Sequence, residues 1–262
     1  MPAPSISIIT PVLNGGRYLR HTLSSVLTQE GDFNLQWLII DGGSTDDTIS
    51  LLQSTNDPRL QWITQSDTGQ TSAINRGLAM ATGDIVAWLN CDDLYAPSAL
   101  ATVAKTFEQN PSAQWLMGRC DIIDGNGNPA RPSVTRFKNR QLDSYSYKSL
   151  LRMNFISQPA VFWRKSFGSS IGKLDESLYW TMDYDLWLRM ARVTPPLIIR
   201  QTLANFRVHD TSKSRGGYRK QFAEGYEVVC RYADNDRISR WLHRLNIEKI
   251  VWGYRVLRAV GR

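Results

Sequence analysis

The first hundred residues alternate between strand-like and helix-like segments four times, and this alternation limits the fold more than any other feature of the sequence. The strand-like segments are short and rich in β-branched residues, and they cover Ser5–Val12, Leu35–Ile40, Leu60–Ile63 and Ile85–Leu89. Apolar residues recur at helical spacing after each of them. Such a repeat is typical of a parallel sheet with right-handed crossovers, so we expect an α/β fold.

Four aspartates directly follow predicted strands, namely Asp41, Asp67, Asp92 and Asp93. Ligands bind at the carboxyl ends of strands in open α/β sheets, so these side chains are expected at one edge of the sheet. Asp92 and Asp93 are adjacent, and neighbouring carboxylates repel each other unless a positive charge neutralises them. A hard divalent cation held by carboxylates and phosphates meets that need. The alternative is a turn in which one Asp caps the next helix.

The chain has 262 residues and a formal net charge of +7, and the excess positive charge lies in its last part. Residues 213–262 contain 12 Lys or Arg and 5 Asp or Glu, whereas residues 1–212 contain 19 of each. The body is therefore neutral, which argues against a nucleic-acid groove running through it. The basic tail instead indicates contact with an anionic surface.

The three cysteines, Cys91, Cys120 and Cys230, are scattered and odd in number. This favours reduced thiols over a disulfide frame or a zinc site. No apolar run approaches the roughly 20 residues of a membrane-spanning helix, and the first five residues lack the features of a secretion signal. We therefore expect a cytoplasmic protein, with a location at the inner face of the membrane as the alternative.

After Pro111 the regular alternation stops, although strand character returns at residues 114–120, 158–163 and 197–203. Residues 130–148 are polar and basic, and we expect either a mobile loop over the sheet or an ordinary solvated loop. A helix is expected to start near Trp180 with carboxylates in its first turn. Residues 237–262 predict a basic helix with Trp and Leu, which suits an anionic membrane surface. The same residues also fit packing on the rest of the chain or on a second subunit.

Several short motifs occur in order along the chain: Ile8–Asn14, Ile40–Asp46, Asp67–Gln70, Ala73–Gly77, Leu89–Asp93, Met182–Arg189 and Phe206–His209. In this order they resemble the family 2 glycosyltransferases, over a region from Ser5 to about Ser214. The resemblance implies the GT-A fold, with a Rossmann-like, mostly parallel central sheet flanked by helices. We expect a catalytic domain at residues 1–215, divided into a nucleotide-binding half (1–110) and an acceptor-binding half (111–215). A basic helical extension at residues 216–262 would follow.

The resemblance also implies a nucleotide site at the ends of the first strands. Thr10 and Pro11 would line the pocket for the base, and Asp41 would accept a hydrogen bond from the base. Asp92 would contact the ribose. The remaining nucleotide-binding positions would be Asn14, Asp67 and Asn75.

A metal ion and a catalytic base complete the site that the resemblance implies. Asp93 would bind the Mn²⁺ or Mg²⁺ that bridges the diphosphate, and His209 would meet the metal or the diphosphate. Asp183 would be the base. Asp183 and Asp185 are two residues apart on a helix and cannot share one face, so the other carboxylate is expected to cap the helix or to pair with Arg189.

The sequence departs from the family pattern in two places. The metal motif often reads Asp-x-Asp, whereas its first position here is Asn90 or Cys91, which makes the metal site weak until the diphosphate arrives. Met182 stands where the family commonly has Glu before the base. The Gln-x-x-Arg-Trp element of processive synthases is missing, which indicates a single-transfer enzyme.

One base without a second nucleophilic carboxylate implies direct displacement with inversion at the anomeric carbon. We therefore expect a metal-dependent transferase that moves a sugar from a nucleotide-diphosphate sugar, most simply a UDP-sugar, to a glycan or lipid-linked acceptor. Its role would lie in polysaccharide or glycolipid assembly. Two alternatives are a nucleotidyltransferase and an inactive sugar- or lipid-binding module. A nucleotidyltransferase would need a basic, Gly-rich loop after the first strand, where Leu13–Arg17 has one Arg and no Lys.

Overall fold

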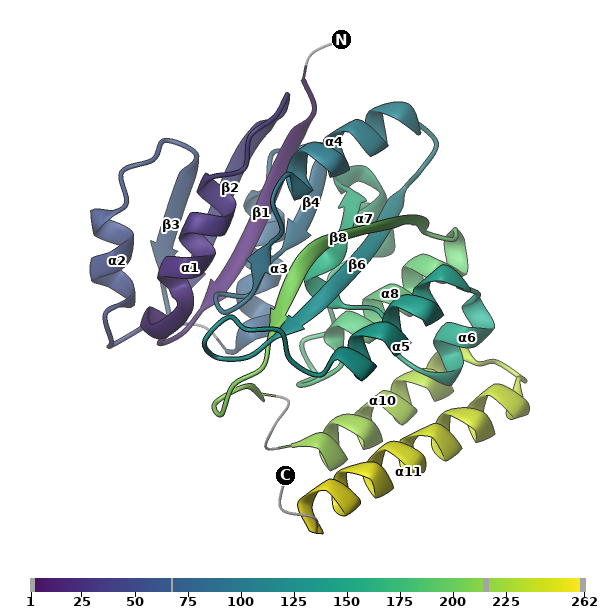
Figure 1. Cartoon of the computed structure of the whole chain (residues 1–262). Coiled ribbons are helices and arrows are strands. Elements are labelled where there is room, and N and C mark those ends of the chain that lie inside the picture. The colour runs from purple at the N-terminus through teal and green to yellow at the C-terminus, as the bar shows by residue number, and fades with distance from the viewer. Residues whose placement is uncertain (1–2, 67, 214–216, 260–262) are drawn as a thin grey trace.

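The computed structural model describes residues 3–66, 68–213 and 217–259. Its centre is one eight-stranded sheet with helices on both faces, which confirms the predicted α/β class (Figure 1). The strands are β1 (Ser5–Val12), β2 (Asn34–Asp41), β3 (Leu60–Thr64), β4 (Ile85–Trp88), β5 (Leu94–Tyr95), β6 (Trp115–Ile123), β7 (Val161–Arg164) and β8 (Leu197–Arg207).

The helices of the first half follow the predicted alternation, and those of the second half were only partly expected. The first-half helices are α1 (Gly16–Leu27), α2 (Thr48–Ser54), α3 (Gln70–Met80) and α4 (Ala99–Gln109). The second half has α5 (Pro132–Asp143), α6 (Tyr147–Arg152), the 3₁₀ turn η1 (Gln158–Ala160), α7 (Lys165–Ile171), α8 (Met182–Val193), α10 (Tyr218–Tyr232) and α11 (Arg237–Ala259).

The strand order is β3-β2-β1-β4-β7-β6-β8-β5. The first four strands in this order run parallel, while β7 is antiparallel to both of its neighbours, β4 and β6. β8 runs parallel to β6. The carboxyl ends of β1, β2, β4, β6 and β8 therefore lie at the same edge of the sheet, which we call the C-terminal edge.

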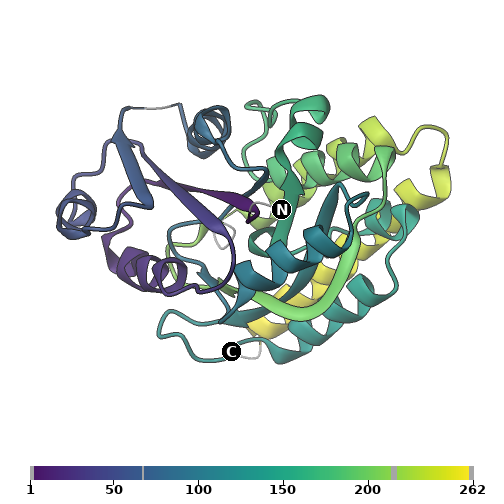
Figure 2. The ribbon, with the colours of Figure 1, turned by 90° about the horizontal axis from the view of Figure 1, so that it is seen from above.

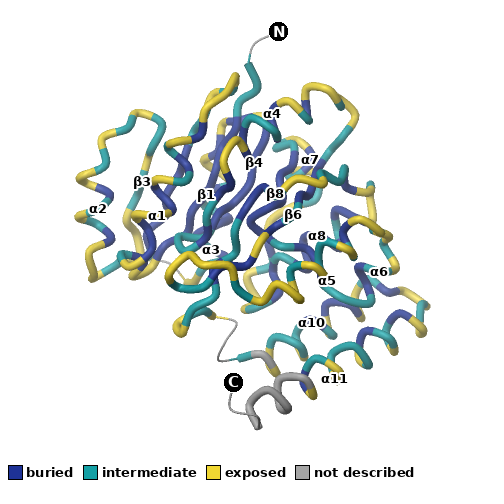
Figure 3. Tube along the Cα trace, in the orientation of Figure 1, coloured by how far each residue is buried: buried dark blue, intermediate teal, exposed yellow. Residues whose placement is uncertain are grey.

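The sheet separates two apolar cores because successive side chains of a strand point to opposite faces. In β1, Ile8 packs in a cluster with Leu23 of α1 and Val103 of α4. The next residue, Ile9, belongs to a second cluster with Ile74 of α3. The view from above shows α1 and α4 on one face and α3, α7 and α8 on the other (Figure 2). The central strands β1, β4 and β7 are almost entirely buried (Figure 3).

The prediction of a loop at residues 130–148 is wrong, because most of this segment forms α5 and the start of α6. In α5 only Leu142 is buried, so the helix lacks the apolar stripe that sequence patterns detect. The strand predicted at residues 197–203 is longer than expected, because β8 continues to Arg207.

The last two helices pack against the rest of the protein. α10 lies against α8 and against α11, and α11 lies against α6. On α11, His243 contacts the carbonyl of Leu151 through Nδ1 at 2.9 Å, and Asn246 donates to the carbonyl of Arg152 at 3.2 Å. Within the described part of the chain, no helix has the length and apolar character needed to cross a bilayer.

Candidate active site

The two adjacent aspartates after β4 have different surroundings. Asp93 is fully buried. Its Oδ1 accepts the backbone N–H of Arg207 at 2.9 Å, and its Oδ2 accepts the side-chain amide of Asn90 at 3.2 Å. Burial, and then the charge of Asp92, raises the pKa of Asp93 well above its usual value. The buried side chain of Asp93 joins the β4 motif to β8, and its contact with a metal stays a prediction.

Asp92 faces His209, which follows β8. The distance from Asp92 Oδ2 to His209 Nε2 is 2.8 Å, and the side chains are 25% and 9% exposed. The hydroxyl of Thr211 lies 2.9 Å from the other ring nitrogen, Nδ1. The imidazole also packs on Tyr18 of α1, with ring centroids 4.5 Å apart. The structure therefore brings the predicted residues Asp92 and His209 together at the C-terminal edge.

Arg207 fixes the backbone beneath this pair. Its side chain is 2% exposed, and Nε donates to the carbonyl oxygen of Asp92 at 2.8 Å. Nη1 donates to the carbonyl of Asp124 at 3.1 Å, and the guanidinium lies 4.9 Å from the ring centroid of Tyr18. Arg207 belongs to a motif that the sequence revealed, but its anchoring role depends on contacts between distant segments.

A chain of side-chain amides connects the aspartate motif to neighbouring elements. Gln70, at the start of α3, donates to Asn90 at 2.9 Å, and Asn90 donates to Gln158 of η1 at 3.2 Å. Lys213 donates to Gln70 at 3.1 Å, and its Nζ lies 3.9 Å from the ring centroid of Tyr179. These contacts link α3, the β4 motif and the segment after β8 around one site.

The loops after β1 and β2 are tied to each other. Asn14 has a positive φ of 53°, which Asn tolerates better than most residues. Its backbone N–H donates to the hydroxyl of Ser44 at 2.7 Å, and its side-chain oxygen accepts the N–H of Thr45 at 2.8 Å. The N–H of Gly16 donates to Asp46 at 2.9 Å. Asn14 therefore sets the relative position of these two loops at the C-terminal edge.

Three of the predicted nucleotide-binding side chains lie inside the protein. Asp41 is fully buried and accepts the backbone N–H of Gly43 at 3.0 Å, while Thr10 accepts the indole N–H of Trp37 at 2.9 Å. Pro11 is also buried. In this structure they shape the ends of β1 and β2, and their contact with a base stays a prediction.

Asn75 has a different place from the one predicted. Its side-chain oxygen accepts the N–H of Leu174 at 2.9 Å, and its amide donates to the carbonyl of Leu174 at 3.0 Å and to Glu176 at 2.9 Å. All of its polar atoms are used to hold the segment before α8, which argues against the nucleotide role. Asp67, the remaining predicted residue, lies outside the residues that the structure describes.

Asp183 lies in the first turn of α8 and is partly exposed. Burial raises its pKa to about 6, while the N–H of Tyr184 at 2.7 Å and the charges of Lys138 and Lys213 act in the opposite direction. Within the described chain, no side chain of another residue donates a hydrogen bond to this carboxylate. A carboxylate with free acceptor capacity and a pKa near neutrality is suited to take up a proton.

Stacked tryptophans fix α8 to the sheet. The ring of Trp187, one turn after Asp183, lies between Trp88 of β4 and Trp115 of β6, at centroid distances of 5.5 and 6.2 Å. The ring planes differ by only 11° and 8°. Trp163 is also buried, as expected for a core residue.

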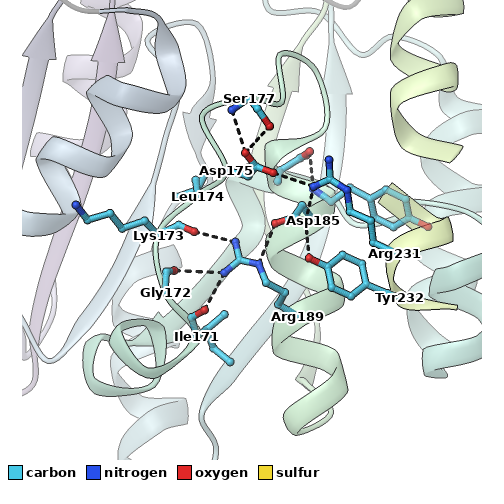
Figure 4. Close-up of polar contacts among 12 residues, drawn as sticks. Ile171, Gly172, Lys173, Leu174, Asp175, Ser177, Asp185, Arg189, Arg231 and Tyr232 are labelled. Atoms are coloured by element: carbon cyan, nitrogen blue, oxygen red, sulfur yellow. Dashed lines mark hydrogen bonds and ion pairs between the residues drawn. The ribbon is translucent and has the colours of Figure 1, made fainter. Parts of the chain in front are cut away.

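Asp185 is held in a separate network, as Figure 4 shows. It is 2% exposed, and its two oxygens accept Arg189 at 2.9 Å and the hydroxyl of Tyr232 at 2.6 Å. Arg231 pairs with Asp175 at 2.8 Å in the same network. The expected pairing of Asp185 with Arg189 is confirmed, and this leaves Asp183 as the carboxylate of α8 with free acceptor capacity.

Glu224 of α10 caps the N-terminus of α8 from outside. It accepts the backbone N–H groups of Tyr179, Trp180 and Thr181 at 3.0, 2.8 and 2.7 Å, and also the hydroxyl of Thr181 at 2.7 Å. Burial opposes its ionisation, but these hydrogen bonds outweigh burial and lower the pKa of Glu224. The sequence did not indicate this role of Glu224. A carboxylate on α10 caps the start of α8, and no local pattern predicts a contact between two separate helices.

Asp92 and His209 are as close together as two neighbouring ligands of a divalent metal would be. In octahedral coordination with bonds of about 2.1 Å, adjacent ligand atoms are about 3 Å apart. The observed 2.8 Å between Asp92 Oδ2 and His209 Nε2 is close to that value. Among the described residues, no group of three or more His, Cys, Asp or Glu could hold an ion. Asp92 and His209 are therefore the two side chains that would hold such an ion.

Comparison of the sequence with known proteins shows the family of this chain. The family model described as glycosyl transferase family 2 matches residues 7–169. An uncharacterized glycosyltransferase of Rickettsia typhi is 29% identical over 235 residues, which are 87% of this chain and 70% of that protein. Chondroitin synthase of Escherichia coli is 28% identical over 239 residues, but these make up 90% of this chain and only 33% of the synthase.

Solved structures show the same fold. The structure of S. aureus TarS 1-349 in complex with UDP-GlcNAc is similar with a TM-score of 0.67 and 16% identity, covering 88% of this chain and 67% of that one. The mannosyltransferase PcManGT of Pyrobaculum calidifontis, in complex with GDP-Man and Mn²⁺, is similar with a TM-score of 0.64 and 15% identity, covering 99% of this chain and 76% of that one. The predicted GT-A architecture is thus confirmed. The chain is a glycosyltransferase and belongs to glycosyl transferase family 2.

Proposed function

We propose that this enzyme makes one glycosidic bond per encounter, with inversion, by moving a sugar from a nucleoside diphosphate to an acceptor hydroxyl. The observation that carries the proposal is the different state of the two carboxylates of α8. Asp183 is partly exposed with a pKa raised to about 6, whereas Asp185 is bound to Arg189 and Tyr232. One available base and no second carboxylate beside it support direct displacement.

Asp183 takes the proton of the acceptor hydroxyl as its oxygen attacks the anomeric carbon. Burial raises the pKa of Asp183 and so makes the carboxylate a stronger base than a free aspartate. Trp187 and Glu224 hold α8 from its two sides, so the base keeps its direction during the reaction.

Asp92 and His209 would hold Mn²⁺ or Mg²⁺, which supplies positive charge to the departing diphosphate when bound. This assigns to Asp92 the metal role that the family resemblance implied for Asp93, and it keeps His209 in the role predicted for it. The support is their 2.8 Å separation and the complete burial of Asp93. Since the PcManGT structure contains Mn²⁺, manganese is the first ion to test.

The donor we propose is a UDP-sugar, held at the C-terminal edge by the linked loops of Asn14 and Ser44. TarS was solved with UDP-GlcNAc and PcManGT with GDP-Man, so donors with both bases belong in the test. The acceptor would be a glycan or a lipid-linked sugar that approaches Asp183 past Tyr179, whose side chain is 57% exposed. A role in polysaccharide or glycolipid assembly follows from such acceptors.

A donor screen with stereochemical analysis tests the proposal. UDP- and GDP-sugars are incubated with Mn²⁺ and simple sugar acceptors, and release of the nucleoside diphosphate is followed. The anomeric configuration of the product is then read by NMR. We expect a β-linked product from an α-linked donor, no product after chelation of the metal, and no product with Asp183→Asn. Retention of configuration would contradict the single-base mechanism, and an undiminished rate with Asp183→Asn would remove Asp183 from it.

A further inference from the structure

Helix α11 exposes its largest apolar side chains on the face that points away from the protein. Trp241 and Trp252 are 62% and 68% exposed, and Ile238 is 67% exposed. The two tryptophans are eleven residues apart, which corresponds to three helical turns and about 16 Å, so they lie on the same face. Large exposed apolar side chains gathered on one surface mark an interaction site.

The face that α11 turns to the protein contains both polar and apolar side chains, and Val251 on it is only 8% exposed. Ser239 and His243 are buried there, with 0% and 6% of their surfaces exposed. Arg152 of α6 donates to the hydroxyl of Ser239 at 3.3 Å, and His243 contacts the carbonyl of Leu151. Contacts of this kind bind α11 to the protein through its inner face, while the tryptophans lie on the opposite face. Packing on the protein does not explain its tryptophans.

The charges on the outward face favour one kind of partner. Arg237, Arg244 and Lys249 are exposed beside the tryptophans, against the single acid Glu248. Residues 213–262 carry the whole net charge of the chain, with 12 Lys or Arg and 5 Asp or Glu. A symmetric dimer through this face would set like charges against each other. An anionic partner removes that repulsion, and tryptophan with flanking cations is the composition that settles at a bilayer surface.

We propose that the outward face of α11 docks the enzyme on an anionic lipid bilayer, with Trp241 and Trp252 at the level of the headgroups. In Figure 1 the carboxyl ends of β1 and β8 point to the lower side of the molecule, along which α10 and α11 also lie. A bilayer along α11 therefore lies on the same side as the C-terminal edge of the sheet. An acceptor anchored in that bilayer would need only to extend along the protein surface to reach the site.

Flotation with lipid vesicles tests the proposal without any measurement of activity. The full chain is mixed with vesicles of phosphatidylcholine, with and without phosphatidylglycerol, at low and at high salt. We expect flotation with the anionic vesicles at low salt and a clear decrease at high salt. Trp241→Ser/Trp252→Ser and Arg244→Glu/Lys249→Glu should each lower partitioning by at least about tenfold. Circular dichroism verifies that the variants are folded.

Matched controls lie on other surfaces. Val193→Ser removes an apolar side chain that is 67% exposed at the end of α8, and Lys105→Glu/Lys173→Glu reverses two exposed charges far from α11. Both should float like the wild type. The proposal is overturned if the wild type does not float, or if the tryptophan variant floats equally well. It is also overturned if light scattering shows a dimer that the tryptophan variant dissociates, while no form of the protein binds vesicles.

Discussion

Asp92 Oδ2 lies 2.8 Å from Nε2 of His209, although 117 residues separate them in the sequence. The pair exists because β4 and β8 both end at the C-terminal edge, and because Asp93 and Arg207 lock the two segments together beneath it. The two adjacent aspartates therefore differ. Asp93 is buried in contacts within the protein, whereas Asp92 is partly exposed and available to a ligand.

The first prediction follows from this difference between Asp92 and Asp93. His209→Ala should weaken Mn²⁺-dependent binding of UDP by at least about tenfold with little loss of stability, because it removes one of two ligands. Asp93→Ala should instead lower the free energy of unfolding by about 1–3 kcal/mol, because the N–H of Arg207 loses its buried acceptor. Calorimetry of UDP binding with Mn²⁺ and with a chelator, together with thermal unfolding, separates the two effects. A His209→Ala protein that binds UDP and Mn²⁺ normally would contradict the metal assignment.

The second prediction concerns the base. Asp183→Asn should lower kcat by about 10²–10⁴-fold and leave donor affinity unchanged, because the base acts on the acceptor. Asp32→Asn, on an exposed carboxylate between α1 and β2, is the matched control and should behave as wild type. Turnover of the control and the variant is measured on the same donor, with donor affinity from calorimetry.

The third prediction is a pH dependence of the rate. Since Asp183 must be ionised to accept a proton and its pKa is about 6, kcat should be constant above that pH and fall below it. One pH unit below the pKa, about a tenth of the base is ionised, so kcat should be roughly tenfold lower. A rate profile that is flat from pH 5 to pH 8 would show that this group does not titrate in the rate-limiting step.

The fourth prediction links the same group to stability. The folded protein holds the proton of Asp183 more tightly than the unfolded chain, because burial raises the folded pKa from 3.8 to about 6. Its contribution to stability is therefore full below pH 3.8 and is lost as the pH rises through 6. Asp183→Asn should be more stable than wild type at neutral pH by about 1–2 kcal/mol, and this difference should shrink toward pH 4. Thermal unfolding at the two pH values measures it, and a variant that is less stable at neutral pH would refute the linkage.

The fifth prediction makes Glu224 a positioning residue. Glu224→Gln should lower kcat by roughly tenfold and leave donor affinity unchanged, because the cap of α8 weakens while the metal pair stays intact. Glu227→Gln, exposed on the same helix, is the control. Glu224→Asp should restore part of the rate. A variant whose donor affinity falls together with its kcat would indicate general unfolding of the site instead.

The first half of the fold was predictable because it depends on local patterns. Each of β1, β2, β3 and β4 is a short apolar run, and the helices between them have an apolar stripe that a periodicity count finds. The second half depends on contacts between distant segments. β7 enters the sheet antiparallel between β4 and β6, and α5 buries only Leu142, so neither shows in a local pattern.

The candidate site shows the same contrast between local sequence patterns and contacts of distant segments. The motif order identified Asp92, Asp183 and His209, because these residue types recur at recognisable places in the family. The different surroundings of Asp92 and Asp93 depend on which of two adjacent side chains points inward, and spacing alone does not decide this. Glu224 and Arg207 act on backbone groups far away in the sequence, so their roles become visible only when the chain is folded.

The stack of Trp88, Trp187 and Trp115 has a spectroscopic consequence. Nearly parallel indole rings 5.5 and 6.2 Å apart are close enough for their electronic transitions to couple. The near-ultraviolet circular dichroism of the protein should therefore contain a band that depends on how α8 lies against β4, and Trp187→Phe should remove it. Because Asp183 is one turn from Trp187, that band is an intrinsic optical signal for the orientation of the helix that carries the proposed base.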